Sequence, residues 1–270
     1  MTDSKKMTYL FSDEGRVKLR TFIDGTTLFA FDLDGTLAPI ISDPNAVMVP
    51  ERVRRGLEQL GTLAPTAVIT GRSRKDALER LGVDVRWLVG NHGAEGLPGH
   101  EKTGEELKQL VAGWQQQLAV LISPELSSDT LLEIKECSIS LHYRHAPDRG
   151  AAHAALLDVI SQLQPAPRRV GGKFVENLVP DNAFHKGDAL LRLMEYAGCA
   201  KAFFLGDDET DEDVFRLNDP RIFSVCVGTD RPTAAGYFLN CQKETAQLLN
   251  ELTVLLKNVK SIWTNIPESH

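Results

Sequence analysis

Strand-like and helix-like segments alternate at both ends of this chain, and this alternation restricts the fold more than any other feature of the sequence. The strand-like runs are short and apolar, and they lie at residues 27–33, 66–70, 85–89, 202–205, 222–227 and 237–239. Stretches with helical spacing of apolar residues also occur, at residues 49–60, 73–81, 186–196 and 244–256. The pattern predicts an α/β fold in which helices cover both faces of a parallel sheet.

The middle of the chain is organised differently. Its segments run helix, two strands, helix, two strands (αββαββ), at residues 105–121, 131–136, 138–143, 151–163, 168–170 and 173–178. Gly171 and Gly172 are expected to form the turn of the last hairpin. This is a compact module of about 75 residues, enough for a small core. We therefore expect a core domain at 1–102 and 180–270, interrupted by an inserted α/β domain at 103–179.

Three helix boundaries can be predicted from local signals. Ser73 precedes a helical pattern and is followed three residues later by Asp76, which is typical of a helix N-terminus. Gly82 and Gly198 each follow the last residue of a helical pattern. Both glycines are expected to end their helices.

Composition excludes several classes of protein. The formal net charge is −7 and there is no long basic run, so a nucleic-acid partner is not expected. No segment approaches eighteen apolar residues and residues 1–7 contain no apolar stretch, so neither a membrane span nor a signal peptide is expected. The four cysteines lack the spacing of a metal site. We expect them to be reduced in a cytoplasmic protein.

Asp32 and Asp34 lie two residues apart at the end of the first strand-like run, and Gly35 and Thr36 follow. The two-residue period of a strand aims both carboxylates to one side. Two such charges are costly to bring together unless a cation or a proton lies between them. Taken alone, the stretch is also compatible with an ordinary turn.

Other polar groups follow later strands of the predicted sheet. Thr70 ends the second strand-like run, Asp207 and Asp208 follow the run at 202–205, and Lys186 begins the helix before it. The carboxyl ends of parallel strands form one edge of the sheet, where ligands bind in open α/β folds. We therefore expect these groups to meet.

The set has the chemistry of phosphomonoester hydrolysis. Carboxylate oxygens are ligands that Mg²⁺ prefers, and the hydroxyl of Thr70 and the amide of Gly71 suit a phosphoryl oxygen. Lys186 adds a positive charge. One carboxylate can attack phosphorus, while another protonates the leaving oxygen and later activates water.

Each part alone has a simpler interpretation. Lys186 could be a solvated helix residue, and the acidic run at 207–213 a solvated helix start. A calcium-binding EF-hand loop is excluded, because it requires Gly at position six and Glu at position twelve. Counting from Asp32 gives Leu37 and Asp43 at these positions, and counting from Asp207 gives Glu212 at position six.

Four ordered motifs resemble those of the haloacid dehalogenase (HAD) superfamily of phosphatases: Asp32-Leu33-Asp34-Gly35-Thr36, Thr70-Gly71-Arg72, Lys186-Gly187 and Gly206-Asp207-Asp208. The run from Gly206 to Phe215 is similar to the Gly-Asp-Asp-x-Thr-Asp-Glu-x-x-Phe run of trehalose-6-phosphate phosphatases. Residues 91–95 and 140–144 also resemble that family. The resemblance implies a Rossmann-like core with an α/β cap inserted between the second and third motifs. It also implies that the cap closes over the sugar.

The resemblance also implies roles for individual residues. Asp32 would be the nucleophile and Asp34 the general acid/base. Mg²⁺ would be held by the carboxylates of Asp32 and Asp207 and by the backbone carbonyl of Asp34. The remaining roles comprise phosphate binding by Thr70, Gly71 and Lys186, orientation of water or Lys186 by Asp208 and Asp211, and sugar contacts by Arg72, His92, Glu133, Lys135 and Asn177. His142 and Arg144 lie in a matching stretch, where a structural role in the cap sheet is equally compatible.

Asn177 departs from the family pattern Gly-Lys-x-Val-x-Glu-x-x-Pro at the end of the cap. Aligned without a gap through Gly172 and Pro180, the position of the glutamate falls on Asn177. A one-residue gap would restore Glu176 but turn it to the opposite strand face unless a bulge intervened. The departure leaves the phosphatase chemistry intact and bears on the identity of the sugar.

The leading hypothesis is an Mg²⁺-dependent phosphatase that converts trehalose 6-phosphate to trehalose and is functionally coupled to a glycosyl-phosphate synthase. Another glycosyl phosphate is an alternative substrate, such as sucrose 6-phosphate, glucosylglycerol phosphate or a glycosyl-3-phosphoglycerate. A non-catalytic sugar-phosphate-binding protein belongs to a different class, and phosphotransfer between two sugars is a third alternative. Phosphate release that chelation abolishes would separate the catalytic from the non-catalytic hypothesis.

Overall fold

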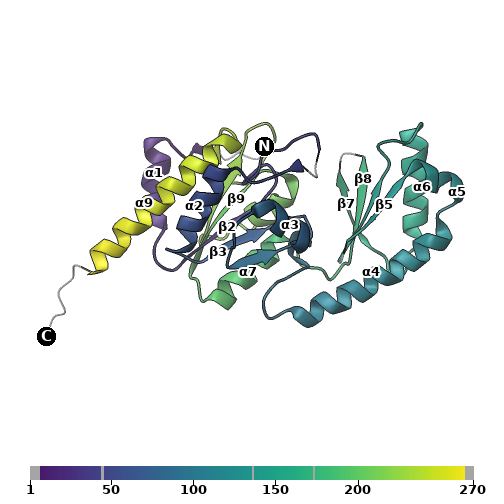
Figure 1. Cartoon of the computed structure of the whole chain (residues 1–270), viewed down its shortest axis with the longest axis horizontal. Coiled ribbons are helices and arrows are strands. Elements are labelled where there is room, and N and C mark those ends of the chain that lie inside the picture. Colours follow the sequence, from purple (N-terminus) through teal and green to yellow (C-terminus); the bar gives the residue numbers. More distant parts are fainter. Residues whose placement is uncertain (1–6, 44–45, 136, 173, 265–270) are drawn as a thin grey trace. The chain divides into compact units, whose positions relative to one another are not determined.

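The computed structural model describes residues 7–43, 46–135, 137–172 and 174–264 (Figure 1). The chain divides into two compact units. The core unit comprises Met1–Gly93, Leu97–Gly99 and Phe184–His270, and the inserted unit comprises Ala94–Gly96 and His100–Ala183. The segment 103–179, expected as an inserted domain, lies within the second of these units.

The core unit contains a seven-stranded parallel sheet with the strand order β1-β11-β10-β9-β2-β3-β4. Its strands are β1 (Thr8–Tyr9), β2 (Thr27–Phe31), β3 (Thr66–Ile69), β4 (Trp87–Val89), β9 (Lys201–Gly206), β10 (Ile222–Val227) and β11 (Tyr237–Leu239). Strand β2 lies between β9 and β3, so three strands far apart in sequence are neighbours at the centre of the sheet. The predicted α/β class is confirmed.

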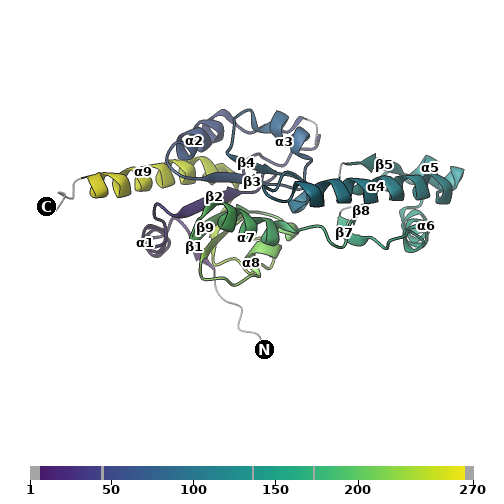
Figure 2. The ribbon, with the colours of Figure 1, turned by 90° about the horizontal axis from the view of Figure 1, so that it is seen from below.

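Helices cover both faces of the core sheet. They are α1 (Asp13–Phe22), α2 (Glu51–Gly61), α3 (Arg74–Leu81), α7 (Lys186–Ala197), α8 (Glu212–Phe215) and α9 (Thr245–Thr264), with short 3₁₀ turns η2 (Asn91–Gly93), η3 (Glu209–Asp211) and η4 (Gln242–Glu244). Helices α2 and α9 lie on one side of the sheet, and α7 and α8 on the other (Figure 2). Both faces of the central strands are therefore buried, which explains their continuous apolar runs.

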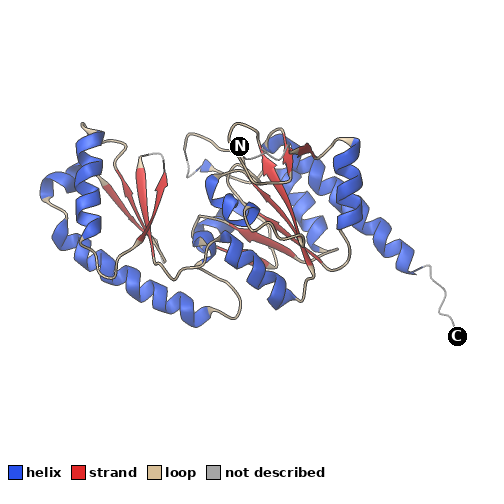
Figure 3. Cartoon of the chain, turned by 180° about the vertical axis from the view of Figure 1, so that it is seen from behind, coloured by secondary structure: helices blue, strands red, loops and turns tan. Residues whose placement is uncertain are grey.

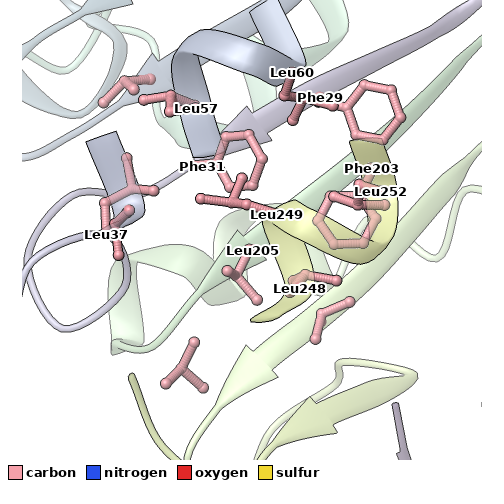
Figure 4. Packing of buried hydrophobic residues seen from close by; sticks show 14 of the residues in the cluster. Phe29, Phe31, Leu37, Leu57, Leu60, Phe203, Leu205, Leu248, Leu249 and Leu252 are labelled. Atoms are coloured by element: carbon pink, nitrogen blue, oxygen red, sulfur yellow. The ribbon is translucent and has the colours of Figure 1, made fainter. Parts of the chain in front are cut away.

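Alternate side chains of each central strand belong to different cores. Phe29 and Phe31 of β2 pack with Phe203 of β9 and with leucines of α2 and α9 (Figure 4). Leu28 and Ala30 of β2 instead join the cluster that includes α7. Because the period of a strand is two, the residues after β2 continue the same alternation toward the edge of the sheet.

The caps of helices α3 and α7 agree with the predicted helix boundaries. The Ser73 hydroxyl accepts a hydrogen bond from the Asp76 amide at the start of α3, and Gly82 ends that helix with φ of 59°. Gly198 ends α7 with φ of 64°. Both glycines occupy the left-handed region that favours a residue without Cβ, so the predicted helix ends are confirmed.

The inserted unit packs three helices with a four-stranded antiparallel sheet, whose order is β5-β6-β8-β7 (Figure 3). Its elements are α4 (Glu101–Leu121), α5 (Pro124–Asp129), β5 (Leu131–Ile134), β6 (Ile139–His142), α6 (Arg149–Ser161), β7 (Arg168–Gly172) and β8 (Val175–Val179). Trp114 of α4 and Leu156 of α6 pack against Ile139, Leu141 and Leu178 of the sheet. The unit therefore has a hydrophobic core of its own.

Several local predictions were wrong. Gly171 and Gly172 do not form the hairpin turn, because β7 continues through both residues and pairs with β8. The αββαββ pattern lacked the short helix α5, which begins at Pro124 behind the N-cap Ser123. Strand β1 and helix α1 were not expected.

Among the described residues, no helix combines the length and the apolarity that a membrane span requires.

Candidate active site

Three neighbouring strands deliver the predicted site residues to one edge of the core sheet. Asp32 follows β2, Thr70 follows β3 and Asp207 follows β9. The strands are held in register by parallel pairing, and the Asp32 amide donates a hydrogen bond to the Leu205 carbonyl at 2.8 Å. The expected convergence at the carboxyl ends of the strands is therefore observed.

Lys186 joins Asp32 to a second carboxylate, that of Asp211. Its Nζ lies 2.7 Å from Oδ1 of Asp32 and 2.7 Å from Oδ1 of Asp211. The side chain is only 1% exposed, although it belongs to the first turn of α7, where a lysine is usually solvated. A buried ammonium paired with two carboxylates is a built site rather than a surface charge.

The turn after β9 carries the remaining acids. Oδ2 of Asp211 accepts hydrogen bonds from the amides of Asp207 and Asp208 at 2.8 and 3.0 Å. A Cβ at Gly35, whose φ is 80°, would lie 2.0 Å from Oδ2 of Asp207. The glycine of the first motif is therefore required because it lets the Asp207 carboxylate approach the loop after β2.

The acidic groups fit a divalent cation. One carboxylate oxygen from each of Asp32, Asp207 and Asp211 can be chosen so that all lie within 4.8 Å of one another. Both oxygens of Asp211 already accept hydrogen bonds, from Lys186 and from the two amides. Asp32 and Asp207 are therefore the carboxylates best suited to a hard cation such as Mg²⁺.

The pKa shifts of Asp32 and Asp207 also favour a cation at this place. Burial raises the pKa of Asp32 well above its usual value, Lys186 opposes the rise, and the carboxylates of Asp211 and Asp207 add to it. Burial, followed by the carboxylates of Asp211 and Asp208, raises the pKa of Asp207 to about 7. Since like charges raise both values, a bound cation would favour the ionised forms.

Thr70, Gly71 and His92 form a second group at this edge. Thr70 is fully buried, and its hydroxyl accepts a hydrogen bond from the Arg72 amide at 3.2 Å. A Cβ at Gly71 would lie 2.3 Å from Cε1 of His92, so the imidazole packs directly against the glycine backbone. The His92 amide donates to the Thr70 carbonyl at 2.9 Å. The turn predicted to bind phosphate is thus held by residues 91–93.

Arg72 contacts two carboxylates in the structure. Its Nε and Nη2 donate to Oδ2 and Oδ1 of Asp34 at 2.6 and 2.7 Å. Its Nη1 donates to Asp76 at 2.6 Å. The arrangement links the predicted general acid/base to α3, a relationship that the motif did not indicate.

The inserted unit aligns its predicted sugar contacts in one row. Glu133 of β5 pairs with Ser140 of β6, which pairs with Asn177 of β8. Directly opposed residues of antiparallel strands share a face, and Lys135 follows Glu133 by two residues. Oδ1 of Asn177 accepts a hydrogen bond from the Ser140 hydroxyl at 2.7 Å, and its Nδ2 donates to the Val170 carbonyl at 3.0 Å.

Glu176 lies on the other face of β8. The strand pairs continuously with β6 and β7, so no bulge reverses the alternation. Oε1 of Glu176 is 2.8 Å from Nε2 of His153 on α6. His142, by contrast, contacts Glu133 at 2.9 Å within the sheet. Asn177, the residue that the ungapped match gives for the family's glutamate, therefore lies in the row with Ser140, and Glu176 does not.

The family model described as trehalose-phosphatase matches residues 30–243, which is more than half of the chain. The chain belongs to the trehalose-phosphatase family. The matched stretch contains every predicted site residue in the core and in the inserted unit.

A curated trehalose-phosphate phosphatase of Mycobacterium tuberculosis is 32% identical to this family member over 247 residues. The match covers 84% of this chain and 61% of that protein, so the chain spans about three fifths of the length of such curated relatives.

Solved structures of other family members and of a wider group share the fold. The C-terminal domain of the trehalose-6-phosphate phosphatase of C. albicans superimposes with a TM-score of 0.65 at 21% identity, covering 93% of this chain and 99% of that domain. A haloacid dehalogenase-like hydrolase of Bacteroides thetaiotaomicron gives 0.58 at 15% identity, covering 84% of this chain and 99% of that one. The core therefore has the HAD fold.

Sequence reasoning gave no individual role at the site to Asp76, Glu212 or Arg231, although Glu212 belongs to the Gly206–Phe215 motif. Asp76 holds Arg72, and Arg231 and Glu212 contact each other behind the turn after β9 at 2.9 Å. Arg231 lies in the loop between β10 and β11, outside every motif. No sequence signal marks such a residue, because its role depends on a contact with a distant loop.

Proposed function

We propose that this chain hydrolyses a sugar phosphate, with trehalose 6-phosphate as the leading substrate and Mg²⁺ as the cofactor. The observation that carries the proposal is the bridge of Lys186 between Asp32 and Asp211 beside Asp207. A buried ammonium among acids at a sheet edge fits a dianionic phosphoryl group and a cation together. Membership of the trehalose-phosphatase family supports the same reaction class.

Asp32 would act as the nucleophile. A carboxylate oxygen of Asp32 forms a bond to phosphorus while the bond from phosphorus to the sugar oxygen breaks. Lys186 donates a hydrogen bond to the Asp32 carboxylate, and its positive charge offsets the negative charge of the phosphoryl group. Bound Mg²⁺, held by Asp32 and Asp207, would neutralise phosphoryl charge. The product of this step is an aspartyl-phosphate and a free sugar.

Asp34 would move the protons. As an acid it gives a proton to the departing sugar oxygen, and as a base it takes one from the water that attacks the aspartyl-phosphate. Attack by water forms the new bond to phosphorus and releases the Asp32 carboxylate, so the enzyme returns to its initial state. Arg72 would orient the Asp34 carboxylate between the two steps.

The inserted unit would select the sugar through the row formed by Glu133, Ser140 and Asn177. Because Asn177 replaces a carboxylate, another glycosyl phosphate remains a second candidate. Charge-assisted hydrogen bonds to sugar hydroxyls are roughly twice as strong as neutral ones.

None of the four cysteines forms a disulfide, which is compatible with a reducing cytoplasm. We further propose coupling to a synthase that supplies the sugar phosphate.

Free phosphate release tests the proposal. Trehalose 6-phosphate, sucrose 6-phosphate, glucosylglycerol phosphate and glycosyl-3-phosphoglycerate are each incubated with the enzyme and Mg²⁺, with and without a chelator. We expect chelator-sensitive release that is fastest from trehalose 6-phosphate. Comparable rates on all four substrates would contradict the specificity, and the absence of release from any would contradict the catalytic proposal.

A further inference from the structure

We infer that Arg231 is a positioning residue that fixes the Asp207–Asp208 turn in the shape needed for cation binding. Its guanidinium binds the backbone carbonyls of the turn. Nε donates to the Asp207 carbonyl at 2.9 Å, and Nη2 donates to the Asp208 carbonyl. Two successive carbonyls are thus bound by one planar, permanently charged group.

The opposite side of the same turn is bound by Asp211. The amides of Asp207 and Asp208 both donate to Oδ2 of Asp211. Each of the two residues is therefore held by its N–H on one side and by its C=O on the other. Since Oδ1 of Asp211 accepts from Lys186, the turn is connected through that lysine to Asp32. Arg231 completes this network at its outer end.

Glu212 holds Arg231 in place. Its side chain is 1% exposed, and Oε1 accepts a hydrogen bond from Nη1 of Arg231 at 2.9 Å. Oε2 accepts a hydrogen bond from the Ala234 amide at 3.0 Å. The loop between β10 and β11 is therefore fastened to α8 at two points, and the guanidinium is fixed before any cation binds. A buried glutamate without this arginine would lack its closest cation.

The space around Asp207 explains why this fixation matters. Its carboxylate approaches the Gly35 backbone too closely for any Cβ at that position, and Oδ1 lies 3.3 Å from the Thr36 hydroxyl. A small rotation of the turn would move this carboxylate away from Asp32. The positive charge of Arg231 also offsets repulsion among the acids of the turn. Groups that orient metal ligands typically contribute 10- to 100-fold to metal affinity.

Arg216 provides a matched control. Its Nε lies 3.7 Å from Oε2 of the same Glu212, but its side chain is 65% exposed. Arg216→Ala removes a charge next to Glu212 and leaves the carbonyl contacts of Arg231 in place. Arg231→Lys keeps a positive charge for Glu212 but lacks the planar fork that spans both carbonyls.

The inference rests on the proposed function, so the test measures Mg²⁺ binding by titration calorimetry and phosphate release separately. We expect Arg231→Ala to raise the Mg²⁺ dissociation constant by at least about tenfold and to lower kcat. Both values for Arg216→Ala should lie within about twofold of the wild type. Arg231→Lys should recover the melting temperature but not the Mg²⁺ affinity. That separation would not follow from a merely structural role.

Equal Mg²⁺ affinity in the wild type and Arg231→Ala would overturn the inference. If Arg231→Ala does not fold, the same comparison is made with Arg231→Lys, whose unchanged affinity would overturn it equally. A wild-type chain that binds Mg²⁺ about tenfold more tightly than the Arg231 variants but releases no phosphate would contradict the proposed function and support the positioning role. A wild-type chain that does not bind Mg²⁺ would contradict both.

Discussion

Arg72 binds the carboxylate of Asp34 through two parallel hydrogen bonds, from Nε to Oδ2 at 2.6 Å and from Nη2 to Oδ1 at 2.7 Å. Such a bidentate pair fixes both the position and the orientation of a carboxylate. In the proposed reaction Asp34 gives a proton to the departing sugar oxygen and takes one from the attacking water, so its orientation determines which of these oxygens it can reach. Arg72 would therefore act on catalysis through Asp34, in addition to the sugar contact that the motif predicts.

Asp34→Asn should lower kcat by about two to four orders of magnitude, the usual contribution of a general acid/base. The amide has nearly the shape of the carboxylate but cannot accept the proton of water. Mg²⁺ affinity, measured by titration calorimetry, should change little, because the predicted metal contact of Asp34 is its backbone carbonyl. A kcat within tenfold of the wild type would contradict the role of Asp34.

Lys186→Met should destabilise the fold by about 3–5 kcal/mol, because it leaves Asp32 and Asp211 buried without their shared cation. The measurement is urea denaturation monitored by circular dichroism. Lys201→Met is the control: Lys201 pairs with Asp24 at 2.6 Å in a half-exposed setting, where an ion pair contributes about 0.2–1 kcal/mol. Equal losses in the two variants would contradict the proposed burial energetics.

The raised pKa of Asp207 predicts how the stability of the metal-free protein depends on pH. The pKa of this carboxyl is raised to about 7 in the folded chain from a usual value of 3.8, so folding favours the protonated form. Its contribution to the unfolding free energy is thus complete below about pH 4 and is lost as the pH rises through about 7. Over the upper part of this interval Mg²⁺ affinity should increase, because the cation needs the carboxylate.

Thermal unfolding and Mg²⁺ titration between about pH 5 and pH 8 check both trends. The Asp207→Asn variant should lose the part of this pH dependence that comes from Asp207, so its pH dependence should be weaker than that of the wild type. A Mg²⁺ affinity that is independent of pH across the interval would disagree with the raised pKa.

Asn177→Glu should change the order in which the enzyme prefers glycosyl phosphates. A carboxylate in the row with Glu133 and Ser140 could accept charge-assisted hydrogen bonds from sugar hydroxyls, which the present amide cannot match. Ratios of kcat/KM over the substrate panel measure the effect. Glu176→Gln, on the opposite face of β8, should leave the order unchanged. If neither variant alters it, residue 177 is structural.

Much of the core could be predicted because its signals are local. The apolar runs identify β10 and β11 to the residue, and Ser73 and Gly82 act on the backbone within one helical turn. The clustering of Asp32 with Asp207 followed from a general property of parallel sheets. Such features need no knowledge of tertiary contacts.

The errors concern features that depend on tertiary packing. Gly171 and Gly172 have the composition of a turn, yet pairing with β8 draws both into a strand. Lys186 was expected at the site, but its full burial depends on Asp32 and Asp211, which lie 154 and 25 residues away in the sequence. Arg231 belongs to no motif, because two of its partners are backbone carbonyls, which any sequence provides, and its side-chain partner Glu212 lies 19 residues away.

The covalent intermediate on Asp32 tests the central claim most directly. Trehalose 6-phosphate and Mg²⁺ are mixed with the enzyme, the reaction is stopped in acid within one turnover, and peptides are analysed by mass spectrometry. We predict a phosphoryl group on the peptide containing Asp32, and neither this adduct nor phosphate release in Asp32→Asn. Phosphate release by Asp32→Asn at a rate close to that of the wild type would contradict the account.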